Sequence, residues 1–525
     1  MQDELTRRRF LSQTAGGLVA TTAGATVAGS LLARQDAPPA KRPNIILIFD
    51  DQLRRQACSV YDGYVTDNVT MPNAERLAKE GLTFNHALSI CPLCTPWRGM
   101  LQTGRYPTHS GIVVNFIDIN PRERCLAHMF RDGGYDTAFI GKWHLWAGSK
   151  RHDGKHAPTT DAEKDKVQAN RAAFLQLHPE PEFVPLEAPR AGYDHFRGYN
   201  FHTSFNDFWY FANKPRRIES KKYETDTEID LAMEFISQRP DKSNPFFMVI
   251  APHPPHPPFT KASVPAGYLQ KIPAKLHWSE NVPPNNAHRK NSLPARCYYS
   301  MIKCMDDNLG RLLDFLDHSN LSDDTIVVFT ADHGEMLGSH NRNNKMVPYA
   351  ESVDLPLIMR WPGHIPANER TDVLQTPLDY VPTLCALAGL RPPEAIDGVD
   401  LSDVVLGRKK VNRDAVYMAN YVSNWDYFDT GTIWPEWRGL RTPQFTYAKW
   451  LNGKEELYDN PNDPGQLWNL AEGASADIPH LKQFRARLKE LMAVAHDEFL
   501  PGTAYADWYD DQRRLIKTAL GPVGV

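Results

Sequence analysis

The chain has 525 residues, of which 42% are hydrophobic, and its 59 basic and 63 acidic residues give a formal net charge of −4. This length allows a large buried core and predicts one large domain with a smaller companion, or two to three domains. The sequence contains no basic tract of the kind that follows a phosphate backbone, so we expect no nucleic-acid partner.

The N-terminus has the pattern of an export signal. Arg7 and Arg8 are followed by an apolar pair and a charge-free stretch to residue 33 that is rich in Gly, Ala and Thr. This stretch is less apolar than a spanning helix of about 20 residues normally is, and no other segment is long and apolar enough to span a membrane. We predict that residues 1–40 are a twin-arginine signal peptide, with a disordered tail as the alternative. The mature protein is then periplasmic or extracellular, in a bacterium.

Five short apolar runs predict strands buried on both faces: residues 44–49, 136–141, 245–251, 325–331 and 355–361. Helical patterns lie between them, for example over 72–81 and 300–318. Strands that alternate with helices predict an α/β fold with a large, mostly parallel sheet sandwiched by helices. Long polar segments at 147–195 and 260–296 interrupt this pattern, and we expect them to be loops that shape a substrate cleft.

The pattern changes after about residue 405. Four short runs between 415 and 460 predict strands of a smaller antiparallel sheet, and residues 480–499 predict an amphipathic helix. We therefore expect a catalytic domain at 41–405 and a C-terminal subdomain at 406–525.

Chemically active side chains follow four of the predicted strands. They are Asp50 and Asp51, then Lys142 and His144, then His253 and His256, and finally Asp332 and His333. Each pair has an ordinary explanation, since aspartates cap helices, histidines in proline-rich loops are solvated and lysines lie on surfaces. In open α/β sheets, however, ligands bind beyond the carboxyl ends of the strands. The convergence of all four pairs predicts a site there.

The predicted site combines carboxylates with positive charge. Aspartates from two strand ends suit a hard cation such as Ca²⁺ or Mg²⁺, whereas His333 suits a softer ion. Such a cation, with Arg98, Lys142 and Lys345 nearby, makes an electropositive pocket that would bind sulfate or phosphate.

Cys94 is one of seven cysteines, and their pairing cannot be read from the sequence. Considered alone, it could belong to a zinc site or a disulfide, act as a nucleophile, or be a buried small residue. Pro96 predicts a helix that starts near Cys94. The positive end of that helix favours an anion beside residue 94.

The segment "CTPWR" (94–98) resembles the Cys-x-Pro-x-Arg hallmark of the formylglycine-dependent sulfatases, which belong to the alkaline-phosphatase-like superfamily. The resemblance runs from "IILIFDDQ" to "ELYDNPNDPGQLWNLA" and includes "GKWH", "PPHPPF" and "ADHGE". It implies that a formylglycine-generating enzyme reads Pro96 and Arg98 and oxidises Cys94 to formylglycine, whose hydrate is the nucleophile.

The resemblance also implies roles for the other residues. Those that match the family's metal positions are Asp50, Asp51, Asp332 and His333, together with an oxygen on residue 94. The implied metal is a single divalent cation, Ca²⁺ first and Mg²⁺ or Mn²⁺ as alternatives. Arg98 would support the nucleophile, and Lys142 and Lys345 would hold sulfate oxygens. His144 would take a proton when sulfate is released, and His256 matches the histidine near the leaving oxygen.

Three residues depart from the family pattern. Trp97 stands where a small residue is commonest, which could make conversion of Cys94 less efficient. His333 stands where many relatives carry Asn, which leaves the metal open. Trp146 stands where Gly is usual, which would change the rim of the pocket.

The implied activity is hydrolysis of sulfate esters on a sulfated carbohydrate. The alternative is a phosphodiester or phosphonate monoester hydrolase on the same scaffold, since the "DHG" histidine occurs in such relatives. A third reading, an inactive sugar-binding relative, conflicts with the intact motifs. The sequence indicates no particular oligomeric state.

Overall fold

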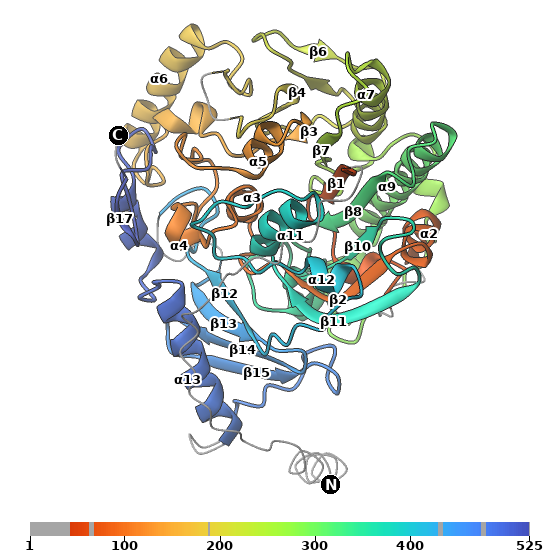
Figure 1. Cartoon of the computed structure of the whole chain (residues 1–525). Coiled ribbons are helices and arrows are strands. Elements are labelled where there is room, and N and C mark those ends of the chain that lie inside the picture. Colours follow the sequence, from red (N-terminus) through yellow and green to blue (C-terminus); the bar gives the residue numbers. More distant parts are fainter. Residues whose placement is uncertain (1–41, 62–67, 187–189, 429–433, 474–478, 524–525) are drawn as a thin grey trace. The chain divides into compact units, whose positions relative to one another are not determined.

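A mixed nine-stranded sheet lies at the centre of the computed structural model (Figure 1), which describes residues 42–61, 68–186, 190–428, 434–473 and 479–523. Its strand order is β11-β2-β10-β8-β1-β7-β3-β4, and β9 pairs with β2. The bounds are β1 Asn44–Asp50, β2 Leu82–Leu88, β3 Asp136–Lys142, β4 His195–Tyr199, β7 Phe246–Ala251, β8 Thr325–Ala331, β9 Asp354–Leu355, β10 Leu357–Arg360 and β11 Glu369–Gln375. The predicted signal peptide lies outside the described residues.

Five neighbouring strands, β8, β1, β7, β3 and β4, run parallel to one another. Four of them match predicted apolar runs, whereas β4 was not predicted. Every residue of β1, β7 and β8 is buried, because helices cover both faces of the sheet. The last predicted run became β10, which is antiparallel to both of its neighbours, β8 and β2.

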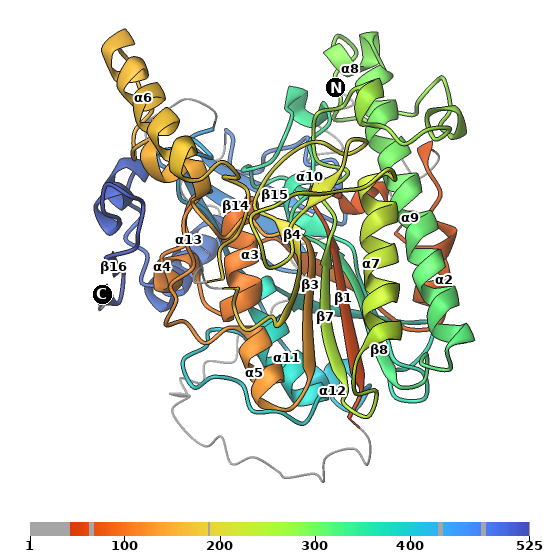
Figure 2. The ribbon, with the colours of Figure 1, turned by 90° about the horizontal axis from the view of Figure 1, so that it is seen from above.

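Helices form a layer on each face of the sheet (Figure 2). One layer contains α3 (Cys94–Thr103), α5 (Leu126–Asp132) and α11 (Tyr380–Leu387). The other contains α2 (Pro72–Lys79), α7 (Glu224–Gln238) and α9 (Leu293–His318). The prediction of a sandwiched sheet is therefore confirmed.

The smaller antiparallel sheet is also confirmed. It has the order β12-β13-β14-β15, with bounds β12 Val416–Asn420, β13 Trp437–Arg441, β14 Phe445–Trp450 and β15 Glu455–Asp459. The predicted helix is α13 (Pro479–Val494), which lies against β12 and β13 (Figure 1). The boundary at residues 405 and 406 stays a prediction, since residues 40–525 form one unit.

The segment 147–195 is not the continuous loop we predicted. It contains the 17-residue helix α6 (Asp161–Leu177), none of whose residues is buried. A capping box at Thr160 and Glu163 starts this helix. An almost entirely solvated helix lacks the apolar stripe on which helix prediction depends, which is why α6 was missed.

The remaining elements are short. They are η2 Arg55–Ala57, α4 Pro107–Ser110, η4 Gly148–His152, β5 Trp209–Tyr210, β6 Ile218–Glu219, η5 Lys261–Ser263, η6 Leu269–Lys271, α8 Ala287–Lys290, η7 Ser339–Asn341, α10 Ala350–Val353, η8 Pro377–Asp379, α12 Ser402–Val405, η9 Gly502–Trp508, β16 Lys517–Thr518 and β17 Gly521–Pro522. Among the described residues, no helix combines the length and the apolar character needed to cross a bilayer. All seven cysteines are described, buried and free of disulfides.

Candidate functional site

The carboxyl ends of four adjacent strands, β8, β1, β7 and β3, meet at one edge of the sheet. The register pairs Asp50 with Ala331, so Asp51 and Asp332 leave neighbouring strands at the same level. The backbone N–H of Asp332 donates to the carbonyl oxygen of Asp50 at 3.2 Å, which fixes the two strand ends together. The aspartates that the sequence placed after separate strands are therefore neighbours in space.

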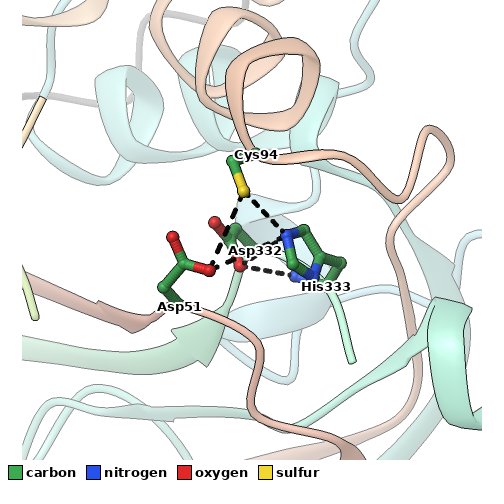
Figure 3. Close-up of side chains that lie close together, drawn as sticks. All are labelled: Asp51, Cys94, Asp332 and His333. Carbon is green, nitrogen blue, oxygen red and sulfur yellow. Dashed lines mark hydrogen bonds and ion pairs between the residues drawn. The ribbon is translucent and has the colours of Figure 1, made fainter. Parts of the chain in front are cut away.

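Cys94 is the first residue of α3, as Pro96 predicted, and it faces these strand ends (Figure 3). Its Sγ lies 3.2 Å from Nε2 of His333 and 3.8 Å from Oδ1 of Asp51. Only 1% of Cys94 is exposed, and all of α3 is buried. Residue 94 thus sits between the positive end of a helix and a group of carboxylates.

Four residues form a group that could hold a cation: Asp51, Cys94, Asp332 and His333 each offer an atom within 4.8 Å of the others. Nδ1 of His333 is 3.2 Å from the carbonyl oxygen of Gly334, so Nδ1–H donates there and the Nε2 lone pair faces the group. Asp50 is not part of this group. It is nevertheless buried next to it, and its Oδ2 has no hydrogen-bond partner among the described residues.

The carboxyl groups of the site have opposite pKa shifts. Burial, followed by the charges of Asp332 and Asp51, raises the pKa of Asp50 well above its usual range. Burial and the charge of Asp51 raise the pKa of Asp332 to about 6. Burial also acts to raise the pKa of Asp51, but Lys142 and further cationic groups hold it well below its usual range. A bound cation would remove the repulsion felt by Asp50 and Asp332.

Asp51 is the residue that links the carboxylates to the cationic side chains. Its Oδ2 accepts from Nζ of Lys142 at 2.5 Å and from the guanidinium of Arg98 at 3.1 Å. Arg98 also lies 3.4 Å from Oδ2 of Asp332 and donates to the carbonyl oxygen of Lys142. Because these side chains are almost fully buried, their charges interact strongly.

Lys345 reaches the site through Gln52. Its Nζ donates to Oε1 of Gln52 at 2.6 Å, and the backbone N–H of Gln52 donates to Oδ1 of Asp332 at 3.0 Å. Gln52 has a φ of 74°, a left-handed conformation that directs the chain sharply after Asp51. Its side-chain amide is held by Glu335, which also accepts from two backbone N–H groups.

His144 lies in an aromatic environment beside the first turn of α3. Its ring is 4.6 Å from that of Phe116 and 4.9 Å from that of Phe201, measured between centroids. Its carbonyl oxygen accepts from Oγ1 of Thr95 at 2.7 Å. Both ring nitrogens are buried and lack a hydrogen-bond partner within the described part of the chain. Burial, with Lys142 and Arg98, lowers the pKa of His144 well below its usual range, so the ring is a neutral base.

His253 and His256 lie together after β7, with their rings 4.5 Å apart. His253 is fully buried, its Nδ1 is 2.6 Å from the carbonyl oxygen of His202, and its Nε2 is 3.1 Å from Nζ of Lys142. His256 is half-buried, and its Nδ1 is 2.8 Å from the carbonyl oxygen of Pro257. Donation from that Nδ1 leaves Nε2 of His256 available to a ligand.

Comparison with known proteins agrees with this arrangement. A family model described as Sulfatase matches residues 43–390, and a second, described as the C-terminal part of N-sulphoglucosamine sulphohydrolase, matches residues 338–494. The chain belongs to the sulfatase family.

Its relatives resemble this sulfatase over most of their lengths. An ulvan-active sulfatase of Formosa agariphila is 30% identical over 487 residues, covering 91% of this chain and 86% of the relative. An N-acetylglucosamine-6-O-sulfatase of Bacteroides thetaiotaomicron is 26% identical, covering 87% and 86%. A solved sulfatase structure from Bacteroides fragilis is 27% identical and superposes with a TM-score of 0.73, covering 91% of this chain and all of that one. The fold is thus the alkaline-phosphatase-like fold of sulfatases, and the protein is a sulfuric ester hydrolase.

Sequence reasoning left two residues out of this sulfatase site. His253 was seen but not given a role, and the structure places it directly on Lys142. Gln52 stands at the end of the quoted "IILIFDDQ" but was given no role, whereas it joins Lys345 to Asp332. The only sequence signal for both residues was their position next to a motif. Their contacts join the ends of different strands, which the spacing of residues in the sequence does not reveal.

Proposed function

We propose that this sulfatase hydrolyses sulfate esters of a carbohydrate, with a formylglycine made from Cys94 as the nucleophile and one divalent cation as cofactor. The observation that carries the proposal is Cys94 at the start of α3, facing Asp51 and His333 within a ring of buried cationic groups. The names of the Formosa and Bacteroides relatives support a carbohydrate substrate, which we propose is a sulfated polysaccharide or its fragments.

The donor set fits a divalent cation. Burial and neighbouring negative charge raise the pKa values of Asp50 and Asp332, and a neutral imidazole nitrogen of His333 is turned toward the carboxyl groups. An added positive charge stabilises this arrangement. We propose Asp50, Asp51, Asp332 and His333 as its protein ligands, with an oxygen on residue 94, and Ca²⁺ before Mg²⁺ or Mn²⁺. The cation would supply electrostatic stabilisation of negative charge at residue 94.

The protein's own residues then carry out nucleophilic attack, sulfate binding and proton transfer. A hydrated aldehyde at residue 94 provides two hydroxyl groups, one to attack sulfur and one to expel the sulfate afterwards. Lys142 and Lys345 hold sulfate oxygens, and Arg98 fixes Asp51 beside the nucleophile. His144 accepts the proton of the second hydroxyl, because its lowered pKa keeps it a free base and its ring nitrogens have no partner among the described residues.

The decisive test of this proposal is the chemistry of residue 94. In a host with the converting enzyme, the peptide that spans Cys94 should be lighter than its encoded mass and should react with hydrazides. Turnover of 4-nitrophenyl sulfate should rise in proportion to the converted fraction and should exceed turnover of an aryl phosphonate. Full activity in a preparation that contains only the unmodified thiol contradicts the formylglycine nucleophile, and faster phosphonate cleavage favours the alternative hydrolase.

Cation binding should depend on pH in a defined direction. The pKa of Asp332 is about 6 in the cation-free fold and about 4 in an unfolded chain, so the folded state binds more protons and loses stability as pH rises between these values. Protons and the cation compete for the same oxygen atoms. Added Ca²⁺ should therefore raise the thermal midpoint little at pH 5 and much more at pH 8. Calorimetry of metal-free protein measures this, and an equal response at both values contradicts the assignment.

His256 should assist only poor leaving groups. A sugar alkoxide needs a proton as the S–O bond breaks, whereas nitrophenolate does not, and general-acid assistance contributes about 10²–10⁴-fold. Burial and then Lys345 lower the pKa of His256, so the negative charge of a bound sulfate ester is needed to protonate it. His256→Ala should lower kcat by this factor on a cognate sugar sulfate and far less on 4-nitrophenyl sulfate. Equal losses in kcat on both substrates assign the acid role to Lys345 instead.

Two further proposals concern location and organisation. We propose that residues 1–40 direct export by the twin-arginine pathway to the periplasm or beyond, which suits a polymeric substrate outside the cytoplasm. We also propose that residues 41–405 form the catalytic domain and 406–525 the C-terminal subdomain. The maturation partner would be the formylglycine-generating enzyme.

A further inference from the structure

A cavity of about 930 Å³ lies between α6, the segment 118–122 and the C-terminal segment 510–523. This volume is within the range of about 300–1,000 Å³ that ligand pockets occupy. Its wall is largely apolar and includes Trp146, Phe174, Phe183, Leu177 and Ile516. The proposed reaction uses none of these residues.

Two segments of the cavity wall are close in the chain to residues around His144. Trp146 is two residues after His144, a distance that the chain spans in at most about 7 Å. On the neighbouring segment, Phe116 packs on the His144 ring and Asp118, two residues further on, lines the cavity. Oδ1 of Asp118 accepts from the backbone N–H of Ala147 at 2.8 Å, which joins the two segments. These two segments therefore connect the wall of the cavity to the surroundings of His144.

Two of the three arginines that line the wall are paired with carboxylates, which favours hydroxyl groups over a free anion. The guanidinium of Arg151 lies 4.6 Å from the centre of the Trp146 ring and is paired with Asp118. At the other side Arg514 is paired with Asp510 at 2.7 Å. An arginine already neutralised by a carboxylate attracts a sulfate group weakly, whereas the pair offers both donors and acceptors to sugar hydroxyls.

We infer that this cavity binds an unsulfated sugar unit of the substrate, next to the unit that carries the cleaved sulfate. The apolar face of a sugar ring would pack on the aromatic side chains, and its hydroxyl groups would meet the paired charges. This inference rests on the proposed carbohydrate substrate. It makes the protein selective for chains of more than one sugar unit.

The test compares substrates of different length in matched variants. Phe174 lies on α6, which has no buried residue, so Phe174→Ala should fold normally, and Gln168→Ala is an exposed control on the same helix outside the cavity. Three substrates are compared. The first is 4-nitrophenyl sulfate, and the other two are the long and the monosaccharide form of the best substrate found in a panel of ulvan and glycosaminoglycan fragments. Phe174→Ala and Trp146→Ala should both raise KM for the long form about three- to tenfold. Phe174→Ala should leave KM for 4-nitrophenyl sulfate and the monosaccharide form nearly unchanged, and Gln168→Ala should leave all three values unchanged.

Inhibition supplies the second measurement. The fully desulfated form of the long substrate should inhibit wild-type protein and inhibit the Phe174→Ala and Trp146→Ala variants more weakly. An unchanged KM in both variants, equal losses on 4-nitrophenyl sulfate, or inhibition that requires sulfate on the second unit overturns the inference. If wild-type protein cleaves 4-nitrophenyl sulfate but no member of the panel, the carbohydrate proposal itself fails.

Discussion

Cys94→Ser should lower the turnover of 4-nitrophenyl sulfate by about 10⁴–10⁶-fold, the range seen when a catalytic nucleophile is disabled. A serine retains one hydroxyl group at the start of α3, facing Asp51, but has no second hydroxyl with which to expel sulfate. The variant should therefore release at most one nitrophenolate per molecule and then stop. Rapid mixing measures that burst, and the mass of the intact protein should show one added sulfate.

Cys94→Ala is the matched control for this experiment, because it leaves no oxygen at residue 94 and should give neither burst nor adduct. Both samples need mass spectrometry to confirm that residue 94 is still the encoded side chain. Sustained turnover by verified Cys94→Ala, which has no oxygen at residue 94, would show that water attacks sulfur directly, and the covalent mechanism is then wrong.

Asp51→Asn and Asp332→Asn should both abolish turnover and cation binding, but only Asp51→Asn should also destabilise the cation-free protein. Asp51 is ionised in the fold and neutralises Lys142 and Arg98, which are buried. Breaking a buried ion pair by removing one partner costs roughly 3–5 kcal/mol. Burial and the charge of Asp51 raise the pKa of Asp332, so its ionised form is disfavoured in the cation-free protein and a neutral side chain in its place costs less stability.

Denaturant unfolding of the cation-free variants measures the difference in free energy of unfolding. Lys142→Met in the Asp51→Asn background is a sharper control, since removing the unpaired cation should restore part of the lost stability. Equal stability of the two single variants would show that the charges of Lys142 and Arg98 are balanced elsewhere.

The strands that the sequence predicted share one physical property. Strands β1, β3, β7, β8 and β10 are buried almost throughout, so each appears as a continuous apolar run. β11 has exposed residues in its first half, and β4 is a five-residue strand with intermediate positions, so neither forms such a run. The antiparallel direction of β10 was likewise unreadable, because an apolar run carries no sign of its direction.

The sequence predicted those residues of the candidate site that lie at strand ends or in family motifs. That rule supplied Asp51, Asp332, His333 and Lys142 and predicted that they would meet. It gave neighbouring aspartates the same role, whereas the structure shows Asp51 held ionised by cations and Asp50 with a raised pKa and an unpartnered oxygen. Which of two adjacent carboxylates meets Lys142 depends on how the end of β3 is placed relative to the end of β1, with β7 between them, and only the folded chain decides it.

Because α3 is completely buried, modification of residue 94 must precede folding. An enzyme that modifies residue 94 must take hold of the chain around it, yet Cys94 and Arg98 are at most 2% exposed once folding is complete. The proposed conversion would therefore compete with folding, and the ratio of the two rates would set the fraction of active molecules. Molecules that fold before conversion would keep a buried thiol at residue 94. Later exposure to the converting enzyme or longer storage should therefore not activate them.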